Sequence, residues 1–515
     1  MRAPLGLCLA VAFGAAACLP QPKAGCRTSD DCVGNRVCIL ATCHTVSSDG
    51  GAESATSAAR DLGDDQAEAE DAPGPRSGDG ADGDLAASPP AEPSQDAAVD
   101  SGRETIQDAP DAVAPSPDTA ARDASVVAEV RAGCKTSHDC VAPYVCNRNI
   151  DNTCGPPRYT HVDVADVTTC AVVSDGTLRC WGAQVGPASN AQYLAPYQVP
   201  AQEDVRAVAT GWGSTCALLR TGQVDCWGYN ANGQLGCASP TTSPNGPHCT
   251  PYPAGSPIEQ LVAGAERICV RKKDSTVECW GRNDHGDVGD GTKTARFSPA
   301  VVSGISDATS IATGVWQACA VLASGSLRCW GANDRAQLGN GTTAATTVPT
   351  TVYGMDGRAV AVIAASPAED HTCALLSSGS VRCFGENLYG ELGSGQTSRL
   401  SAIPVSSGFQ RPAVVVASGI GFTCAVLNDN SVQCLGRGDR GQLGNGEYAQ
   451  SLVPVTVRLP EGMSIRSLAT KYAHICALTT EGRLWCWGAN SDGQLGDGTT
   501  DDASVPVEVP VPLAM

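Results

Sequence analysis

Seven cysteine pairs with one common spacing constrain the fold of this chain more than any other feature. The two cysteines of each pair are ten positions apart, and the first cysteines follow one another at intervals of 46 to 54 residues. The pairs are Cys170 and Cys180, Cys216 and Cys226, Cys269 and Cys279, Cys319 and Cys329, Cys373 and Cys383, Cys424 and Cys434, and Cys476 and Cys486. A period of this length is typical of proteins built from copies of one small unit. The sequence therefore predicts a repeat protein.

Within a repeat, the residues between the two cysteines predict a tight β-hairpin. Apolar residues recur on both sides of a short Ser-Ser-Gly segment at 377–379, as in two strands joined by a turn. With the turn centred on position 378, Cys373 and Cys383 face each other across the hairpin, close enough for a disulfide. We expect a disulfide in each of the seven hairpins. The alternative is a zinc site, but structural zinc sites usually need Cys-x2-4-Cys knuckles.

The remaining cysteines are consistent with an oxidised protein. The chain has 26 cysteines; if Cys8 lies in a leader and Cys18 has its own fate, 24 remain, enough for twelve bridges. Seven belong to the hairpins, one joins Cys237 to Cys249, and four fall in two N-terminal modules. An even and regular set of cysteines predicts an oxidising compartment.

The N-terminus predicts export and a lipid anchor. Arg2 supplies a positive start, residues 5–13 are mainly apolar, and three alanines precede Cys18. This resembles a bacterial lipobox, in which residues 1–17 are the signal peptide and Cys18 is lipidated. We expect secretion across the inner membrane and lipid anchoring in a bacterial outer membrane or at the cell surface. The alternative is a plain secretory signal with Cys18 unmodified.

Two short cysteine-rich modules and a long linker precede the repeats. The first module, with the lipidated cysteine, spans 18–44, and the second spans 131–158. Their cysteines are Cys26, Cys32, Cys38, Cys43 and Cys134, Cys140, Cys146, Cys154. Segments this short need bridges, and each module allows three connectivities. A metal site that uses His44 or His138 is the alternative.

Residues 45–130 predict a disordered acidic linker. This segment has no aromatic residue and no cysteine, and it is dominated by Ala, Asp, Gly, Pro and Ser. Its 20 acidic residues against four arginines account for 16 of the 20 net negative charges of the chain. We expect a stalk or spacer, and an acidic tail for a basic partner is the alternative.

A second motif follows the cysteine pair in six of the seven repeats, with small departures. It combines Trp-Gly, Asn and a Gly-x-Leu-Gly turn, as in Trp227-Gly228-x-Asn230-x-x-Gly233-Gln-Leu-Gly236, Trp330-Gly331-x-Asn333-x-x-Gln337-Leu-Gly339 and Trp487-Gly488-x-Asn490-x-x-Gly493-Gln-Leu-Gly496. On these residues the chain resembles the regulator of chromosome condensation repeat family over residues 159–515. The resemblance implies an all-β fold, a seven-bladed β-propeller. The first blade departs from the pattern, because Trp181 is followed by Gly-Ala-Gln-Val-Gly without the full turn.

Several structural expectations follow from the repeats. The large residue after each second cysteine should pack between blades; these residues are Trp181, Trp227, Trp280, Trp330, Phe384, Leu435 and Trp487. Asn230, Asn333, Asn387 and Asn490 should bond the backbone of their own turns. The last strand, 505–509, should complete the first blade, which would close the ring and remove exposed sheet edges.

Binding residues should lie where equivalent positions differ between repeats. The short loop before each first cysteine varies most, and in a closed propeller these loops would ring one face. The candidate partner contacts there are Trp212, Arg267, Trp316, Phe422 and Tyr472, which include the aromatic and arginine side chains enriched at interface hot spots. The alternative is that these side chains only cap the central channel. The disulfide-stapled loop 237–249 is a second candidate.

Catalytic and metal motifs are scarce. The seven histidines form no pair at metal-ligand spacing, and there is no Gly-x-Ser-x-Gly elbow or phosphate-binding loop. Asp497 opens an acidic segment that lacks the 12-residue calcium-loop pattern, which favours a solvated turn. We expect no cofactor, no metal and no enzymatic activity.

The expected function is therefore a non-catalytic, extracytoplasmic, lipid-anchored module for protein–protein interaction through one propeller face. One resembling kind is a secreted inhibitor that caps β-lactamases, so an inhibitor-like role is its sharper form. The compartment and the lack of a basic patch argue against nuclear exchange-factor and nucleic-acid roles, and we expect a monomer. The alternatives are a glycan-binding surface protein and, as a third class, a hydrolase or lyase.

Overall fold

The computed structural model describes residues 36–39, 42–45, 134–135, 137, 140, 144–183, 192–200, 202–237, 248–355, 358–364 and 371–511. For 36–39, 42–45 and 360–364 the description is of the backbone alone. The expected signal peptide, the lipidation at Cys18 and the acidic linker lie outside these residues. No helix in the described part of the chain is long and apolar enough to cross a membrane.

Seven four-stranded antiparallel sheets follow one another along the chain, each with its strands paired in sequence order. The first three are β5 (Tyr159–Val164), β6 (Thr168–Val173), β7 (Leu178–Gly182), β8 (Tyr193–Gln198); β9 (Val205–Thr210), β10 (Ser214–Leu219), β11 (Val224–Gly228), β12 (Cys249–Tyr252); and β13 (Ile258–Ala263), β14 (Arg267–Lys272), β15 (Val277–Gly281), β16 (Arg296–Val301).

The next two sheets are β17 (Ala308–Thr313), β18 (Gln317–Leu322), β19 (Leu327–Gly331), β20 (Thr346–Thr351); and β21 (Ala359–Ala364), β22 (His371–Leu376), β23 (Val381–Asn387), β24 (Ser398–Ser406). The last two are β25 (Ala413–Gly419), β26 (Phe422–Leu427), β27 (Val432–Gly436), β28 (Ser451–Thr456); and β29 (Ile465–Thr470), β30 (His474–Thr479), β31 (Leu484–Gly488), β32 (Ala503–Val509).

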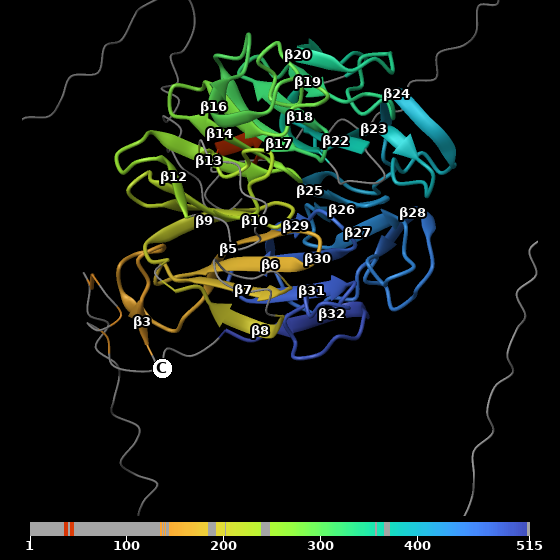
Figure 1. Ribbon diagram of the computed structural model, residues 1–515. Coiled ribbons are helices and arrows are strands. Elements are labelled where there is room, and N and C mark those ends of the chain that lie inside the picture. The colour runs from red at the N-terminus through yellow and green to blue at the C-terminus, as the bar shows by residue number, and fades with distance from the viewer. Residues whose placement is uncertain are drawn as a thin grey trace, which may run out of the picture. The chain divides into compact units, whose positions relative to one another are not determined.

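The sheets are the blades of a closed propeller (Figure 1). Each sheet packs against the next in the sequence, and β5 of the first blade lies against β29 and β30 of the seventh. The expected all-β, seven-bladed fold is confirmed. The core consists of a layer of buried apolar side chains between each pair of neighbouring blades.

The ring closes differently from the sequence-based expectation. The last strand, β32, pairs with β31 of its own blade, so the prediction that it completes the first blade is wrong. The strand that comes just before an inner strand in the sequence belongs to the preceding blade, as its outermost strand. For example, β16 precedes β17 but pairs with β15. The propeller therefore starts with an inner strand, β5, and ends with an outer one, β32, and each of its seven described sheets has four strands. At the seam, the Tyr159 amide donates to Gly482 O at 2.8 Å, and its hydroxyl donates to Pro510 O at 2.8 Å.

The seven expected hairpin disulfides are present, one in each blade. They join Cys170 to Cys180, Cys216 to Cys226, Cys269 to Cys279, Cys319 to Cys329, Cys373 to Cys383, Cys424 to Cys434 and Cys476 to Cys486. In every blade the two cysteines are register partners on the second and third strands. Their Cα atoms lie 4.0 to 4.1 Å apart.

The expected symmetry of each pair about its turn is thus confirmed, and the zinc alternative is not supported in the hairpins, because a disulfide sulfur is not the thiolate that binds metal. The eighth bridge expected in this part of the chain, between Cys237 and Cys249, is also present. It joins the loop that precedes β12 to the first residue of that strand.

The repeated tryptophan and asparagine residues hold neighbouring blades and turns together. The indole N–H of Trp330 donates to Asp287 O in the Gly-x-Leu-Gly turn of the preceding blade, at 2.9 Å. Trp181, Trp280 and Trp487 make the equivalent bond at 2.9 to 3.1 Å. Within its own turn, Asn333 Oδ1 accepts from the Leu338 amide at 2.9 Å. Both expected roles are confirmed, and the asparagines are buried.

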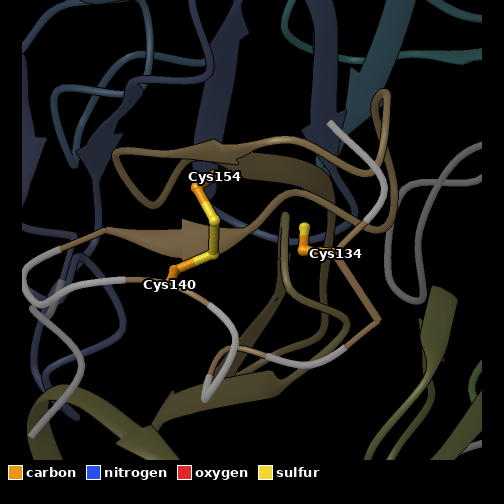
Figure 2. A group of neighbouring side chains, drawn as sticks. All are labelled: Cys134, Cys140 and Cys154. Atoms are coloured by element: carbon orange, nitrogen blue, oxygen red, sulfur yellow. A yellow bond between two sulfur atoms is a disulfide. The ribbon is translucent and has the colours of Figure 1, made fainter. Parts of the chain in front are cut away.

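The second cysteine module has a defined connectivity, first to third and second to fourth. Cys134 pairs with Cys146 and Cys140 with Cys154, around the short strands β3 (Val145–Cys146) and β4 (Cys154–Gly155). Figure 2 shows Cys134 close to the disulfide that joins Cys140 to Cys154. Because these sulfur atoms are bridged, they argue against the metal alternative in this module. In the first module, β1 (Arg36–Ile39) pairs with β2 (Thr42–Thr45); only the backbone is described there, so the disulfides of this module stay a prediction.

The second module packs against the propeller near the β6–β7 turn and the start of β9. Arg148 forms an ion pair of 2.6 Å with Asp204, and its Nε donates to Asp175 O at 2.6 Å. The Asn149 amide donates to Ser174 O at 2.9 Å. These contacts lie at the end of the blades opposite the loops between the first and second strands, because β6 runs from one end of its blade to the other.

Candidate binding site at the channel mouth

The loops between the first and second strands lie at one end of the blades, and we call the described ones together the loop ring. It consists of residues 165–167, 211–213, 264–266, 314–316, 420–421 and 471–473; the fifth blade's loop, 365–370, lies outside the described residues. Neighbouring loops touch through their backbones, since the Trp212 amide donates to Ala265 O and the Ile420 amide to Tyr472 O. A Cβ on Gly264 would lie 2.3 Å from Gly314 O, so this close approach requires glycine.

A shallow pocket opens among these loops, at the mouth of the central channel. It is lined by five of the seven blades. Its residues are Ala165, Thr210, Gly211, Trp212, Ala263, Gly264, Ala265, Thr313, Gly314, Val315, Lys471 and Tyr472. The pocket exists only because the ring is closed, since Ala165 and Tyr472 belong to the first and the last blade.

Two hydroxyl groups of the lining are buried without a hydrogen-bond partner in the described part of the chain. These are Tyr472 Oη and Thr313 Oγ1, and each residue is 7% exposed. Burial raises the pKa of Tyr472 well above its usual range, and the carboxylates of Asp166 and Glu266 act in the same direction. The phenol therefore stays protonated and keeps its capacity both to donate and to accept a hydrogen bond.

Carboxylates surround the mouth of the pocket. Burial raises the pKa of Asp166, whereas a hydrogen bond from the Trp212 side chain lowers it and the nearby charge of Asp492 raises it again. Glu266 accepts a hydrogen bond from Arg282 at 2.9 Å and one from Asn232 Nδ2 at 3.2 Å. Acidic groups thus come from the first, third and seventh blades.

Lys471 ties three blades together rather than presenting its charge to the pocket. Its Nζ lies 2.6 Å from Asp163 Oδ2 and donates to Thr210 O at 2.7 Å. The Thr210 amide also donates to Asp163 Oδ2, at 2.7 Å. The ammonium is therefore neutralised by a partner in the next blade around the ring.

Aromatic rings stand beside the pocket. Trp212 is 44% exposed, a high value for a tryptophan in a folded domain. Trp316 is partly buried, with the Arg282 guanidinium 4.1 Å from its ring centroid and the His285 ring at 5.5 Å in an edge-on contact. Sequence reasoning missed Arg282 and His285, although both lie in the variable segment after a Trp-Gly pair.

The structure separates the five candidate contacts into two groups. Trp212, Trp316 and Tyr472 belong to the loop ring, and Trp212 and Tyr472 line the pocket. Arg267 and Phe422 are instead the first residues of second strands and are 1% and 0% exposed. Their prediction as contacts at this face is wrong.

The cause is the direction of the side chain: at the first position of the second strand, it points between two blades. Arg267 donates to Gln317 O at 2.7 Å in the next blade and is paired with buried Asp287 at 3.3 Å. Phe422 packs in the apolar layer between the sixth and seventh blades, with Ile475 and Trp487. A blade-to-blade contact of this kind cannot be read from one repeat alone.

The other two candidate segments differ in what the structure says. Most of the 237–249 loop lies outside the described residues, so its role stays a prediction. Asp497 Oδ1 accepts hydrogen bonds from the Thr499 amide and hydroxyl at 3.0 and 2.9 Å. Because these bonds hold the carboxylate within its own turn, they favour the solvated turn over a calcium site.

Comparison with protein families finds matches to several of the repeats. Two models described as "Regulator of chromosome condensation (RCC1) repeat" match this chain, one at residues 205–234, 369–391 and 465–494 and the other at 324–375 and 481–514. The matched segments lie in the second, fourth, fifth and seventh blades.

Several known proteins are similar over the propeller. The human E3 ubiquitin-protein ligase HERC2 is 26% identical over 347 residues, which cover 65% of this chain and 7% of the ligase. The ultraviolet-B receptor UVR8 of Arabidopsis thaliana is 30% identical over 289 residues, 55% of this chain and 65% of the receptor. The chain thus spans less than two thirds of either relative.

Two solved structures show the same fold. Human WBSCR16 superposes with a TM-score of 0.55 at 22% identity, covering 64% of this chain and 89% of that one. Yeast RCC1 (Prp20), solved with Kap60 bound, gives a TM-score of 0.57 at 21% identity over 65% of this chain and 83% of that one.

Proposed function

This chain carries regulator of chromosome condensation repeats folded into a seven-bladed propeller, and from this premise we propose that it is a non-catalytic protein-interaction module that binds a partner through the loop ring. A protein of the same fold binds a protein partner, because yeast RCC1 has been solved with Kap60 bound. In its sharper form the proposal is inhibitor-like: the loop ring caps a site on the partner.

The observation that carries the proposal is the pocket at the channel mouth. It combines an exposed tryptophan, two unpartnered hydroxyl groups and a rim of carboxylates on loops that differ from blade to blade, all within the described residues. The scaffold positions repeat, whereas these positions do not. Interface hot spots are enriched in tryptophan and tyrosine side chains, and Trp212 and Tyr472 both line this pocket.

A non-catalytic role is supported by the state of two groups at or next to the pocket, His474 and Lys471. His474, in the second strand next to the pocket loop, is fully buried, and burial lowers its pKa to about 3. Lys471 is held by Asp163. Neither a general base with a pKa near neutrality nor a free amine is thus available at the mouth from these two residues.

We further propose that Cys18 carries the lipid anchor and that the acidic linker is the tether. The support is the lipobox-like sequence and the attachment of the second module at the end of the blades opposite the loop ring. A chain that enters the propeller through this module leaves the loop ring free to point away from the membrane.

The test is capture of a partner from cell-surface extracts by the full chain and by variants. We expect one protein to bind the wild type and to be lost with Trp212→Ala and Trp316→Ala, because each substitution removes a ring from the proposed interface. Tyr353→Ala is the matched control, since Tyr353 is 59% exposed and lies beyond β20 at the opposite end of its blade. Equal unfolding midpoints would show that the variants are folded.

Capture that is indifferent to both tryptophan substitutions would contradict the use of the loop ring. A glycan array probed with the same proteins tests the alternative: sugar binding that is lost with Trp212→Ala would favour a glycan-binding protein. Anchoring is read from the same cells, because Cys18→Ala should move the protein from the membrane fraction to the soluble fraction. Retention of that variant in the membrane fraction would overturn the anchor.

A further inference from the structure

We infer that the pocket at the channel mouth takes a single basic side chain of the partner, and that an arginine guanidinium fits it best. The inference rests on the proposed function and names the chemistry that this site would recognise. It follows from three properties of the described residues: charge, stacking surface and unpartnered hydroxyl groups.

The local charge favours a cation. Among the described groups at the mouth or next to its residues, carboxylates outnumber cations. The carboxylates belong to Asp163, Asp166, Glu266, Asp284, Asp287 and Asp492, and the cations to Lys471, Arg267 and Arg282. Each cation is already paired, Lys471 with Asp163, Arg267 with Asp287, and Arg282 with Glu266 and Asp284. The described groups that shift the pKa of Asp166 are the Trp212 side chain and the acidic Asp492, and neither is a cation.

The stacking surface favours a planar cation. Trp212 presents an exposed ring beside Asp166, and a guanidinium stacks on an indole while it donates to a carboxylate. The same molecule makes this contact elsewhere at this end of the propeller, because Arg282 stacks on Trp316 at 4.1 Å. Trp212 and Asp166 together offer the same ring and carboxylate to a guanidinium from outside.

The hydroxyl groups supply the remaining partners. Tyr472 Oη and Thr313 Oγ1 line the pocket, are buried, and have no partner in the described part of the chain. Buried polar groups without partners are rare and destabilising, and each of these can accept a guanidinium N–H. The pocket is shallow and encloses little space, so it admits one flat group at most rather than a drug-sized molecule.

The experiment compares two blocked pentapeptides, acetyl-Gly-Gly-Arg-Gly-Gly-amide and the same peptide with citrulline in place of arginine. Citrulline has nearly the same shape but is neutral, and a carbonyl oxygen replaces one NH2 group, so the pair of peptides tests the charge and the donors of the guanidinium together. With the full chain, we expect the arginine peptide to bind about tenfold more tightly than the citrulline peptide, in the millimolar range of a single side chain. Calorimetric titration and saturation-transfer NMR of the peptide both measure this difference.

Variants locate the binding. Asp166→Asn keeps the shape and removes the charge, and we expect it to abolish most of the preference for arginine. Trp212→Leu should weaken the arginine peptide more than the citrulline peptide, because the cation–π contact is lost. Asp307→Asn is the control, since Asp307 is an exposed carboxylate in the segment that precedes β17, at the opposite end of its blade; it should bind both peptides as the wild type does.

Equal affinity of the wild type for the two peptides would overturn the inference, and so would an unchanged arginine preference in both Asp166→Asn and Trp212→Leu. The wild-type comparison needs no variant, so misfolding of a variant cannot leave the question open. Partner capture that depends on Trp212 together with equal peptide affinities would refute this inference and leave the proposed function standing. An arginine preference, together with partner capture that does not change in the Trp212 and Trp316 variants, would support this inference and refute the proposed function.

Discussion

The first residue of the second strand is a histidine in two blades, His371 in the fifth and His474 in the seventh, and differs among the other five. Both histidines are buried. His474 Nε2 lies 2.9 Å from Thr169 Oγ1 in the next blade, and His371 Nε2 lies 2.8 Å from Thr423 Oγ1. Burial lowers the pKa of His474 to about 3. In the fourth blade Gln317 occupies this register and is also fully buried, so the fold accepts an uncharged amide there.

His474→Gln should therefore flatten the acid dependence of stability. The folded protein keeps His474 neutral, whereas the unfolded chain protonates it below its ordinary pKa of 6.5. The histidine's contribution to stability is thus complete above pH 6.5 and falls as the pH drops towards 3, by about 1.4 kcal/mol per pH unit. Urea unfolding at intervals from pH 7 to pH 4 measures the slope for both proteins.

The difference between the two slopes isolates this histidine, because the carboxylates and His161 titrate in both proteins. An identical pH dependence for wild type and variant would mean that His474 is not held neutral in the folded state. At the residue scale, then, the sequence indicates a histidine in a variable loop. In the structure, packing against the neighbouring blade buries this histidine and keeps it uncharged and within hydrogen-bonding distance of a threonine.

At the element scale, the outer strand of each blade has an exposed edge, and this edge is protected against pairing with a further strand. Every outer strand contains one proline, which has no N–H to offer to a further strand; these are Pro196, Pro251, Pro299, Pro349, Pro404, Pro454 and Pro506. Apolar residues next to them are exposed, such as Val301 at 59% and Val453 at 57%. Closing the ring therefore does not remove the outer edges, and proline is the feature that blocks pairing there.

The hairpin disulfide between the second and third strands should contribute to stability within its own blade. Replacing Cys319 and Cys329 together by alanine opens a loop with a separation of ten residues, and a loop of that length corresponds to about 2 to 3 kcal/mol of chain entropy in the unfolded state. We expect a lower midpoint of thermal unfolding, measured by calorimetry.

The matched control is the double alanine variant of Cys140 and Cys154, a bridge in the second module outside the blades. It should leave the midpoint of the propeller unchanged. An unchanged midpoint for the variant without Cys319 and Cys329 would show that this bridge adds nothing to the hairpin register, which the alternation and the turn would then maintain alone.

At the scale of the whole molecule, the seam between the seventh and first blades repeats the contacts of the other seams. The Trp181 indole donates to Gln494 O at 2.9 Å, as Trp330 does to Asp287 O. Lys471, which bonds Asp163 and Thr210, adds a polar link across three blades. Closure therefore depends on the same packing between blades as the rest of the ring and requires no exchange of strands.

The second cysteine module should detach from the propeller when its ion pair is removed. Arg148→Ala deletes the bonds to Asp204 and Asp175, which are charge-assisted and partly buried. We expect the Asn149 amide, which donates to Ser174 O, to exchange its hydrogen about tenfold faster, with the blade amides unchanged. Hydrogen–deuterium exchange with mass spectrometry resolves the two regions.

Arg411→Ala is the matched control for this substitution, because Arg411 forms an ion pair of 2.9 Å with Asp429 on the propeller, far along the sequence from the module. It should leave the exchange of the Asn149 amide as it is. If hydrogen exchange of the Asn149 amide does not change in Arg148→Ala, contacts other than those of Arg148 hold the module against the propeller.

The sequence by itself determined the properties that are local to one repeat. The hairpin register, the cysteine pairing and the asparagine-bound turn each depend on residues within about fifteen positions of one another, so spacing and alternation encode them. The resemblance to a known repeat family supplied the number of blades and their closure into a ring.

Only the tertiary structure decided what depends on two blades at once. It assigned the outer strand to the preceding blade, buried Arg267 and Phe422 between blades, and left Trp212 exposed. It also brought residues from five blades around one pocket. The physical reason is that a side chain two positions before a cysteine has the same place in every repeat, yet its burial and its partners are set by a neighbour about fifty residues away in the sequence.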